Sequence, residues 1–260
     1  LARGGEPLPS ENFGVVRLQR EVLNEDSNVG GIVTSRRGLD GTYNVAYGLD
    51  GLFRIQGQQY VTAKWAQTFQ NGAPNRVASL DPTRVHLQWE NRSYEGLNYA
   101  VRYDRAGRRY EPGVGLELRD DYFRFGDRIG YGWVPGDGSS IQRHQLSLEG
   151  ESYFRNATGT LQTLEIGPEW QMTSNSGHSL TLEATRRVED LTAPFALSET
   201  ARVPAGRYGF GVGEVRYGMP GGWDLRSGLA LSGGGYYDGW RAPLQASPTW
   251  NASRYLRLSG

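Results

Sequence analysis

Residues 142–172 carry the clearest alternation of apolar and polar positions in the chain. In the first half of this stretch, Leu146, Leu148 and Phe154 share one parity, and polar side chains occupy the other. The second half alternates in the same way, and the polar turn at residues 156–159 joins the two. The pattern predicts two antiparallel strands, each with one apolar face and one strongly polar face.

The length of these two predicted strands separates them from ordinary sandwich strands. A strand in a water-soluble sandwich is usually about five or six residues long, and these are about twice that. A strand of roughly ten residues, tilted across the hydrocarbon layer with apolar side chains toward lipid and polar ones toward the lumen, is what a transmembrane β-barrel needs. We therefore predict an all-β fold, an antiparallel transmembrane β-barrel.

The rest of the chain repeats this pattern closely enough to predict roughly 12–14 strands. Several polar faces carry a charged or ionisable side chain, for example Asp50, Lys64, His86 and Asp104. In residues 208–217 the apolar parity switches midway, which predicts a bulge or an environment with two different sides. No fixed-period repeat is present, which argues against a propeller.

Domain organisation follows from the absence of any sharp change in composition. We predict one β-barrel domain over residues 1–260, with an irregular lead-in at 1–12 and a long excursion at 105–127 that lies at a rim or in the lumen. The sequence stops in a strand pattern without a closing strand, so we predict a fragment whose barrel is incomplete.

Composition narrows the classes of function. Hydrophobic residues make up 37% of the chain and the mean hydropathy is −0.58, which fits a barrel with a wet interior. The formal net charge is zero and no basic stripe is present, which argues against nucleic-acid binding. Cysteine is absent, which excludes disulfides and thiolate metal sites. His86, His144 and His178 are too dispersed for a recognised metal spacing, and we expect no cofactor.

Glutamates gather on the polar faces of the central strands. The predicted turns place Glu151 opposite Glu165 and Glu169 opposite Glu183. Such pairs are compatible with a glycosidase acid and base or with Ca²⁺ binding. We favour instead a polar lumen in which arginines neutralise them, as is common in barrel interiors. We name no catalytic residue. The predicted polar cluster comprises Glu149, Glu151, Glu165, Glu169, Glu183, Arg143, Arg155, Arg187 and Arg226.

Most tryptophans fall near the ends of predicted strands. Tryptophan can stack on sugars, but at strand ends it is typical of the aromatic girdles at the lipid headgroup level. The predicted girdle comprises Trp65, Trp89, Trp133, Trp170, Trp223 and Trp250.

Several stretches resemble a known bacterial family. They are FGVVRLQREVLNEDSNVGGIVTSR with GTYNVAYGLDGLFRI, then YEPGVGLELRDDYFRFGDRIGYGW, and LQASPTWNASRYLRLSG. They are similar to the C-terminal outer-membrane barrel of a family of uncharacterised bacterial proteins, in which an N-terminal domain similar to family-nine carbohydrate-binding modules often precedes the barrel. The resemblance implies architecture and location, and it assigns any hydrolase activity to the N-terminal domain that these residues lack.

Three hypotheses of function remain. The first is a barrel in the bacterial outer membrane that acts as a pore or transport conduit, or as a membrane anchor, with lipid and an oligo- or polysaccharide as partners. The second is a soluble all-β glycoside hydrolase or lectin that uses the glutamates. The third is a structural barrel whose lumen is plugged by the excursion. Lipid-facing apolar rows form one exposed band, whereas a soluble protein buries them between two sheets.

Overall fold

The computed structural model describes residues 10–77, 79–199 and 201–260. All regular elements among these residues are β-strands, and neighbouring strands such as β1 and β2 or β8 and β9 pair in antiparallel orientation. This confirms the predicted all-β, antiparallel class. None of the described residues forms a helix long and apolar enough to cross a membrane.

The chain divides into two compact units, which we describe separately. The first unit contains residues 10–90, Arg102–Arg124 and Arg155–Gly159. The second unit contains Asn91–Val101, Phe125–Phe154 and Thr160–Gly260. Strands β6 (Gly96–Ala106) and β7 (Tyr122–Trp133) contribute residues to both.

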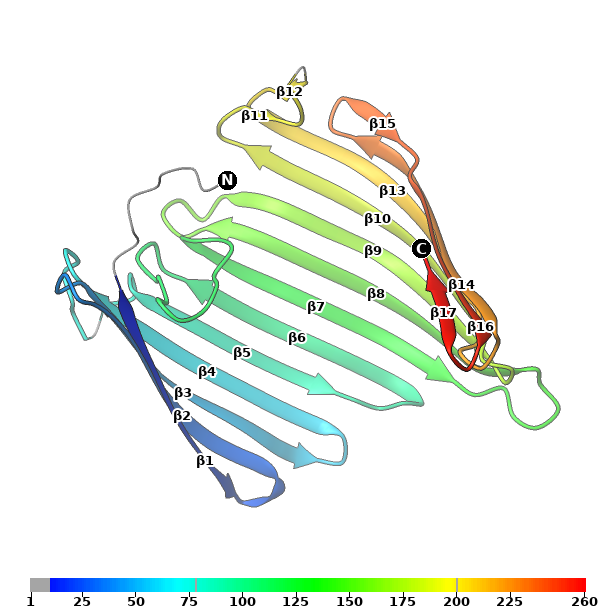
Figure 1. The fold of residues 1–260 in the computed structure, drawn as a ribbon, viewed down its shortest axis with the longest axis horizontal. Helices are drawn as coiled ribbons and strands as arrows, with labels where there is room; N and C mark the ends of the chain where they lie inside the picture. Colours follow the sequence, from blue (N-terminus) through cyan, green and yellow to red (C-terminus); the bar gives the residue numbers. More distant parts are fainter. Residues whose placement is uncertain (1–9, 78, 200) are drawn as a thin grey trace. The chain divides into compact units, whose positions relative to one another are not determined.

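In the first unit, long strands follow one another in the sheet in chain order. Figure 1 shows the first four side by side in blue to cyan. Continuous registers join β1 to β2, β2 to β3 and β3 to β4 over most of their lengths. The strands are β1 (Glu11–Val22), β2 (Asn24–Gly38), β3 (Tyr43–Gln56), β4 (Gln59–Gln70) and β5 (Thr83–Asn91).

Two predicted boundaries of irregular segments need correction. Of the lead-in predicted at residues 1–12, residues 1–9 lie outside the described residues, and β1 already begins at Glu11. The excursion predicted at 105–127 is shorter, because β6 ends at Ala106 and β7 begins at Tyr122. Aromatic and charged side chains at 122–127 alternate with the strand period and therefore extend β7.

The excursion, residues 107–121, lies on the polar face of the first unit. Asn44 Nδ2 donates to the carbonyl of Glu111 at 2.8 Å, and the amide of Gly113 donates to Asn44 Oδ1 at 2.8 Å. Thr68 Oγ1 donates to the carbonyl of Arg109 at 3.3 Å. These contacts hold irregular backbone against β3 and β4 and satisfy part of its hydrogen-bonding capacity.

The second unit contains the hairpin on which the sequence pattern centred. The turn at residues 156–159 is present, with Gly159 in the left-handed region at φ 67°. Figure 1 shows β8, β9, β10 and β13 side by side in green to yellow. The strands are β8 (Ile141–Arg155), β9 (Leu161–Ser174), β10 (Ser179–Leu191), β11 (Phe195–Ala196), β12 (Arg202–Val203), β13 (Gly206–Gly218), β14 (Leu225–Tyr236), β15 (Gly239–Arg241), β16 (Leu244–Ser253) and β17 (Leu256–Ser259).

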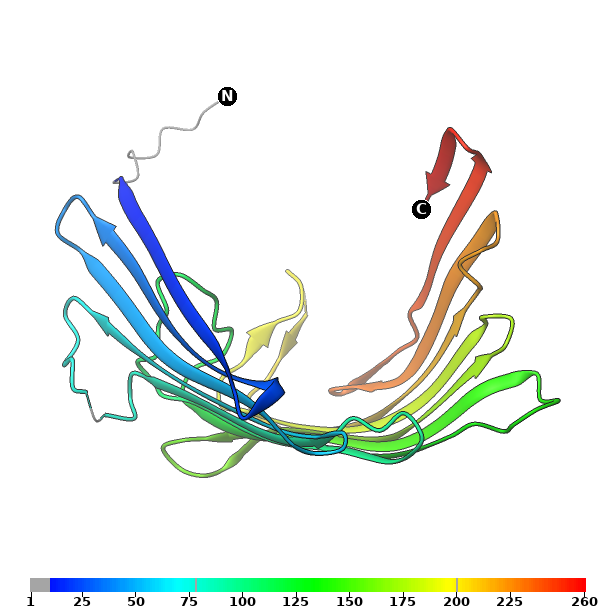
Figure 2. The same ribbon diagram turned by 90° about the horizontal axis from the view of Figure 1, so that it is seen from below.

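The switch of apolar parity in β13 reflects a two-sided environment. β13 pairs with β10 in one unbroken register, so no bulge interrupts that pairing. Phe210 is buried on the polar face, where its ring lies 5.6 Å from the Tyr237 ring. Tyr237 in turn meets Phe195 of β11 at 5.5 Å. Figure 2 shows β11 and β12 standing off the sheet of β10 and β13, so this end of the polar face is locally apolar.

Burial is inverted relative to a water-soluble sheet. Along β8, Gln145 and Ser147 are 4% and 3% exposed, whereas Leu146 and Leu148 are 51% and 47% exposed. The same holds elsewhere in the described residues, where the buried apolar side chains are few: Ala46, Ala106, Tyr122, Val203 and Phe210. Both units therefore place their closest packing on the polar face and leave the apolar face open.

The described strands do not close into a barrel. Among the described residues, β1 pairs with β2 alone and β17 pairs with β16 alone. The described residues therefore form an open antiparallel sheet.

Candidate functional site

The register of the central strands brings the predicted glutamate pairs together. Glu151 lies opposite Glu165 across β8 and β9, and Glu169 lies opposite Glu183 across β9 and β10. The Glu169–Glu183 pair follows from the tight turn between β9 and β10, because a turn of fixed length sets which residues face each other. The Glu151–Glu165 pair depends in addition on a register shift between Tyr153 and Phe154, next to the turn at 156–159. The predicted cross-strand pairing of these glutamates is confirmed.

Arg216 of β13 is the centre of this acidic network. Its Nη2 atom lies 3.0 Å from Glu169 Oε2 and 3.3 Å from Glu183 Oε2, and its Nη1 atom lies 2.5 Å from Glu214 Oε1. A guanidinium group offers five N–H donors in a fixed plane, so one arginine can bind several carboxylates. Glu149 pairs separately with Arg128, whose Nε lies 3.0 Å away.

Among the four predicted arginines, Arg187 forms an ion pair with a predicted glutamate, at 3.4 Å from Glu165. Arg143 donates to the carbonyl of Tyr94 at 3.0 Å and lies over that ring. Arg226 donates to the carbonyl of Gly221 at 2.8 Å. Arg155 ends β8 and belongs to the first unit.

The sequence reasoning missed Arg128, Glu214 and Arg216. For Glu214 and Arg216 the available signal was the register of β13 on β10, which puts Glu214 opposite Glu183 and Arg216 opposite Thr181. The parity switch of apolar residues in β13 obscured that signal. Once the register is known, these charged residues fall on the polar face.

This arrangement does not suit glycoside hydrolysis. That chemistry needs two carboxyl groups that flank an open space for the glycosidic bond. Here the Arg216 guanidinium fills the space between Glu169 and Glu183. No group of three or more His, Asp or Glu among the described residues is arranged to hold a metal ion. The acidic network is therefore a polar surface on which arginines bind the carboxylates.

Aromatic rings form a row on the second unit, near one end of its strands. His144 of β8 stacks between Trp133 of β7 at 5.0 Å and Trp170 of β9 at 5.5 Å. Farther along, His178 meets Trp223 edge-on at 5.3 Å. Trp250 of β16 lies opposite Leu225, at the same end of β14. Four of the six predicted girdle tryptophans thus lie near strand ends in the second unit.

The other two predicted girdle tryptophans, Trp65 of β4 and Trp89 of β5, lie in the first unit. The Trp65 ring packs 5.3 Å from that of Tyr47 on the neighbouring β3. Trp89 is exposed near the end of β5. Two of the three histidines thus belong to the aromatic row, and the third, His86, lies in the first unit.

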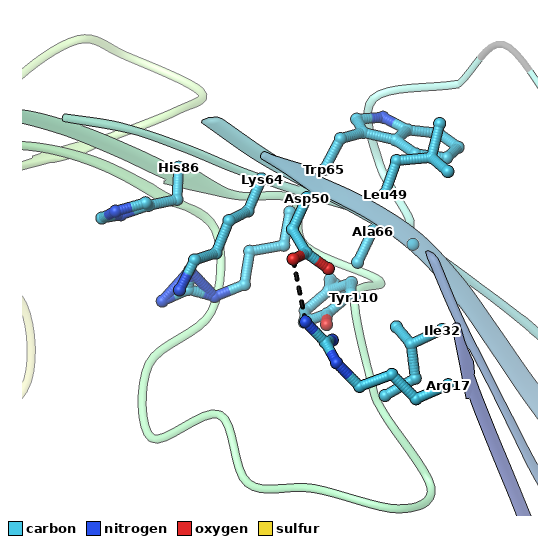
Figure 3. A pocket seen from close by; sticks show the side chains of 11 residues that line it. Arg17, Ile32, Leu49, Asp50, Lys64, Trp65, Ala66, His86 and Tyr110 are labelled. Carbon is cyan, nitrogen blue, oxygen red and sulfur yellow. Dashed lines mark hydrogen bonds and ion pairs between the residues drawn. The ribbon is translucent and has the colours of Figure 1, made fainter. Parts of the chain in front are cut away.

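The first unit carries a pocket of about 350 Å³ on its polar face, which we call the cationic pocket. Figure 3 shows Arg17, Asp50 and Lys64 pointing to one side of the sheet, while Leu49 and Trp65 point to the other. The polar and ionisable lining residues are Arg17, Asp50, Lys64, Arg84, His86 and Tyr110.

Most charged groups at this pocket are paired. Arg17 Nη2 lies 2.9 Å from Asp50 Oδ1. Arg84 lies 2.5 Å from Glu117 Oε2 of the excursion and 3.5 Å from Asp104 Oδ1. Lys64, by contrast, has no hydrogen bond or ion pair with any residue that the structure describes.

Behind the pocket, Asp104 of β6 is held by three cationic or ionisable groups. It is 1% exposed, and His86 Nδ1 lies 2.8 Å from its Oδ1 atom. Arg124 Nε donates to Asp104 Oδ2 at 3.0 Å, and Arg84 is the third group. A buried carboxylate needs such partners to offset its desolvation, so Asp104 fixes the side chains that form one wall of the pocket.

Tyr110 supplies the wall contributed by the excursion. Burial raises the pKa of its hydroxyl, and the nearby Arg84 guanidinium opposes that change only in part. The hydroxyl therefore stays protonated near neutral pH and remains a hydrogen-bond donor.

No protein-family model, curated protein or solved structure matches this chain.

Proposed function

We propose that this chain forms part of the wall of a β-barrel in the bacterial outer membrane, with its apolar face toward lipid and its polar face toward an aqueous interior. The barrel serves as a conduit for solutes, or as the membrane anchor of a carbohydrate-binding domain. The observation that carries this proposal is the inverted burial along β8, where the leucines are exposed and the neighbouring polar side chains are buried. In water such a face costs roughly 25 cal/mol for each Å² of apolar surface; in lipid that cost vanishes.

Strand length and the aromatic row support the same orientation. His144 and Phe154 share a parity and lie ten residues apart on β8, or about 33 Å along a strand. At a tilt of about 40°, that length spans about 25 Å, the height of the apolar band in outer-membrane barrels. The His144 end carries the stacked Trp133 and Trp170, and at the other end the Phe125 ring meets Phe154 at 6.3 Å.

The carbohydrate association rests on the resemblance to the barrel that follows a carbohydrate-binding-like domain. The alternative of a soluble hydrolase or lectin requires a second layer over the apolar face. The described residues supply only the short β11–β12 pair apart from the long strands, and that pair stands on the polar side, beside Phe210 and Tyr237.

The first test is where the full-length protein fractionates in its native cell envelope, combined with the gel mobility of detergent-extracted protein before and after boiling. We expect the outer-membrane fraction and a mobility shift on boiling. Recovery in the soluble fraction without detergent would overturn the proposal. Glu165→Gln and Glu169→Gln would then be tested for loss of glycan binding or hydrolysis.

The second test compares two neighbouring positions on opposite faces of β8. The 260 residues contain no cysteine, so Leu148→Cys and Glu149→Cys each introduce a single thiol in this part of the protein. In liposomes, a charged water-soluble thiol reagent should modify the cysteine at position 149 and spare the one at 148. Equal modification of both would contradict a lipid-facing apolar surface.

A further inference from the structure

Lys64 is the only lysine among the 260 residues. Apart from the three histidines, all other basic side chains are arginines. It lies on β4 opposite Asp50, but Asp50 binds Arg17 instead. The Lys64 side chain is exposed, and Figure 3 shows it reaching into the cationic pocket beside Asp50. Its ammonium group has no described partner, in contrast to the paired arginines around it.

The charge balance of the pocket leaves one positive charge uncompensated. Asp50 balances Arg17, Glu117 balances Arg84, and Arg124 balances Asp104. Glu117 and Asp104 lie behind Arg84 and do not line the pocket. Lys64 is therefore the free charge, and a concave site with one free positive charge concentrates anions.

We propose that the cationic pocket binds a small organic carboxylate, with Lys64 as the partner of the carboxylate group and Arg17 and Tyr110 as additional hydrogen-bond donors. Arg17 uses only Nη2 in its bond to Asp50, which leaves other guanidinium N–H groups for a ligand. A monoanion matches the single free charge. A pocket of about 350 Å³ lies at the small end of the range for ligand sites.

This site requires only that the polar face meets water, so it does not depend on the membrane proposal. Fractionation tests the location of the protein, and ligand binding tests the pocket. The two proposals can fail separately.

Glucuronate and glucose form a matched pair of probes, because they differ in the carboxylate that replaces the terminal hydroxymethyl group. Titration calorimetry on the purified full-length protein should show glucuronate binding at least about tenfold more tightly than glucose, as expected for a charge-assisted contact. Equal affinity would overturn the proposal. Tighter binding of glucose 6-phosphate than of glucuronate would also overturn it and assign the pocket to phosphates.

Three variants separate charge from structure. Lys64→Gln should weaken glucuronate binding about tenfold, while Lys64→Arg keeps the charge and should keep most of the affinity. Asp50→Asn removes the one carboxylate that lines the pocket, so it should strengthen binding. Unchanged affinity in Lys64→Gln, or weaker binding in a folded Asp50→Asn protein, would refute the assignment.

An independent readout uses the primary amine of Lys64. Glucuronate should slow acylation of Lys64 by an amine-reactive ester, measured by mass spectrometry of the peptide that contains it. The α-amino group of the same protein, whose rate should not change, is the internal control. Equal acylation rates with and without glucuronate would contradict binding at this pocket.

Discussion

Charged side chains on the polar faces are arranged in groups linked by ion pairs. In the second unit Arg216 serves three glutamates, and in the first unit Asp104 is held by His86, Arg84 and Arg124. A buried charge is tolerated only when nearby opposite charges and hydrogen bonds offset its desolvation. Lys64 has no such partner among the described residues, because it faces an open pocket in which water can solvate its ammonium group or a ligand can bind it.

Replacing Asp104 tests how much its ion pairs with Arg84 and Arg124 stabilise the protein. Asp104→Ala leaves the guanidinium groups of Arg84 and Arg124 without their shared carboxylate, and we expect a loss of about 3–5 kcal/mol in the free energy of unfolding. Urea denaturation followed by tryptophan fluorescence measures this loss. Asp26→Ala, which removes an exposed partner of Arg54, is the control and should change stability little. Equal effects of the two substitutions would contradict the buried network.

Gly167 of β9 marks a place where two strands approach closely. A Cβ atom at this position would lie 1.8 Å from the carbonyl oxygen of Ala184 on β10. We expect Gly167→Ala to destabilise the protein by about 1–3 kcal/mol through overpacking. At Gly150 the nearest atom to such a Cβ, on Ile166, lies 3.7 Å away. Gly150→Ala should therefore be neutral or stabilise by up to about 1 kcal/mol. Thermal unfolding distinguishes the two variants, and a stable Gly167→Ala protein would disprove the close approach.

The excursion at 107–121 connects β6 to β7 and also covers part of the polar face. It is attached through side chains of β3 and β4, mainly Asn44 and Thr68. The hypothesis of a plugged lumen placed this segment in the interior, and its contacts with the polar face are consistent with that hypothesis. Whether solutes pass beside it is decided by how firmly these few hydrogen bonds hold it.

Asn44→Ala tests that attachment. It removes the donor to the Glu111 carbonyl and the acceptor for the Gly113 amide. With about 1 kcal/mol for each hydrogen bond, we expect the excursion to open at least about tenfold more often. Limited trypsin cleavage after Arg108 and Arg109 should accelerate accordingly. Asn12→Ala on β1, where no described side-chain hydrogen bond is lost, is the control. Equal cleavage of both variants would show that Asn44 does not hold the segment.

In both units, strands such as β3, β6 and β8 combine an exposed apolar face with a more closely packed polar face. An exposed apolar side chain is common on any protein, but a whole sheet face of them is not. The large exposed apolar residues recur from Leu18 of β1 to Leu244 of β16. That distribution is why we orient the apolar face toward lipid.

Leu148→Arg provides the corresponding prediction. Leu148 lies near the middle of β8, so in a membrane the arginine would sit near the bilayer midplane. We expect a loss of about 2–4 kcal/mol in the free energy of unfolding in lipid vesicles. Leu148→Phe, which stays apolar, should cost far less. In a water-soluble protein, arginine at this half-exposed site would be nearly neutral, so that result would contradict the proposed orientation.

The sequence alone determined the strands, their two faces and the central hairpin. The side-chain period of a strand is two, so alternation can be read locally. The short turn at 156–159 made β8 and β9 neighbours, and a register shift between Tyr153 and Phe154 then set Glu151 opposite Glu165. Boundaries were less certain where aromatic and charged residues continue a strand pattern, as at the start of β7.

Only the tertiary structure decided which arginine neutralises the glutamates, where the excursion lies and that Lys64 is unpaired. Arg216 reaches Glu169 two strands away, and Arg84 finds Glu117 on the excursion. Such contacts depend on the pairing register of several successive strands and on the path of an irregular segment. Neither is encoded in the local alternation of apolar and polar residues. The tertiary structure also decided which residues are buried. The alternating pattern shows which residues share a face of a strand, but it does not show which face is covered.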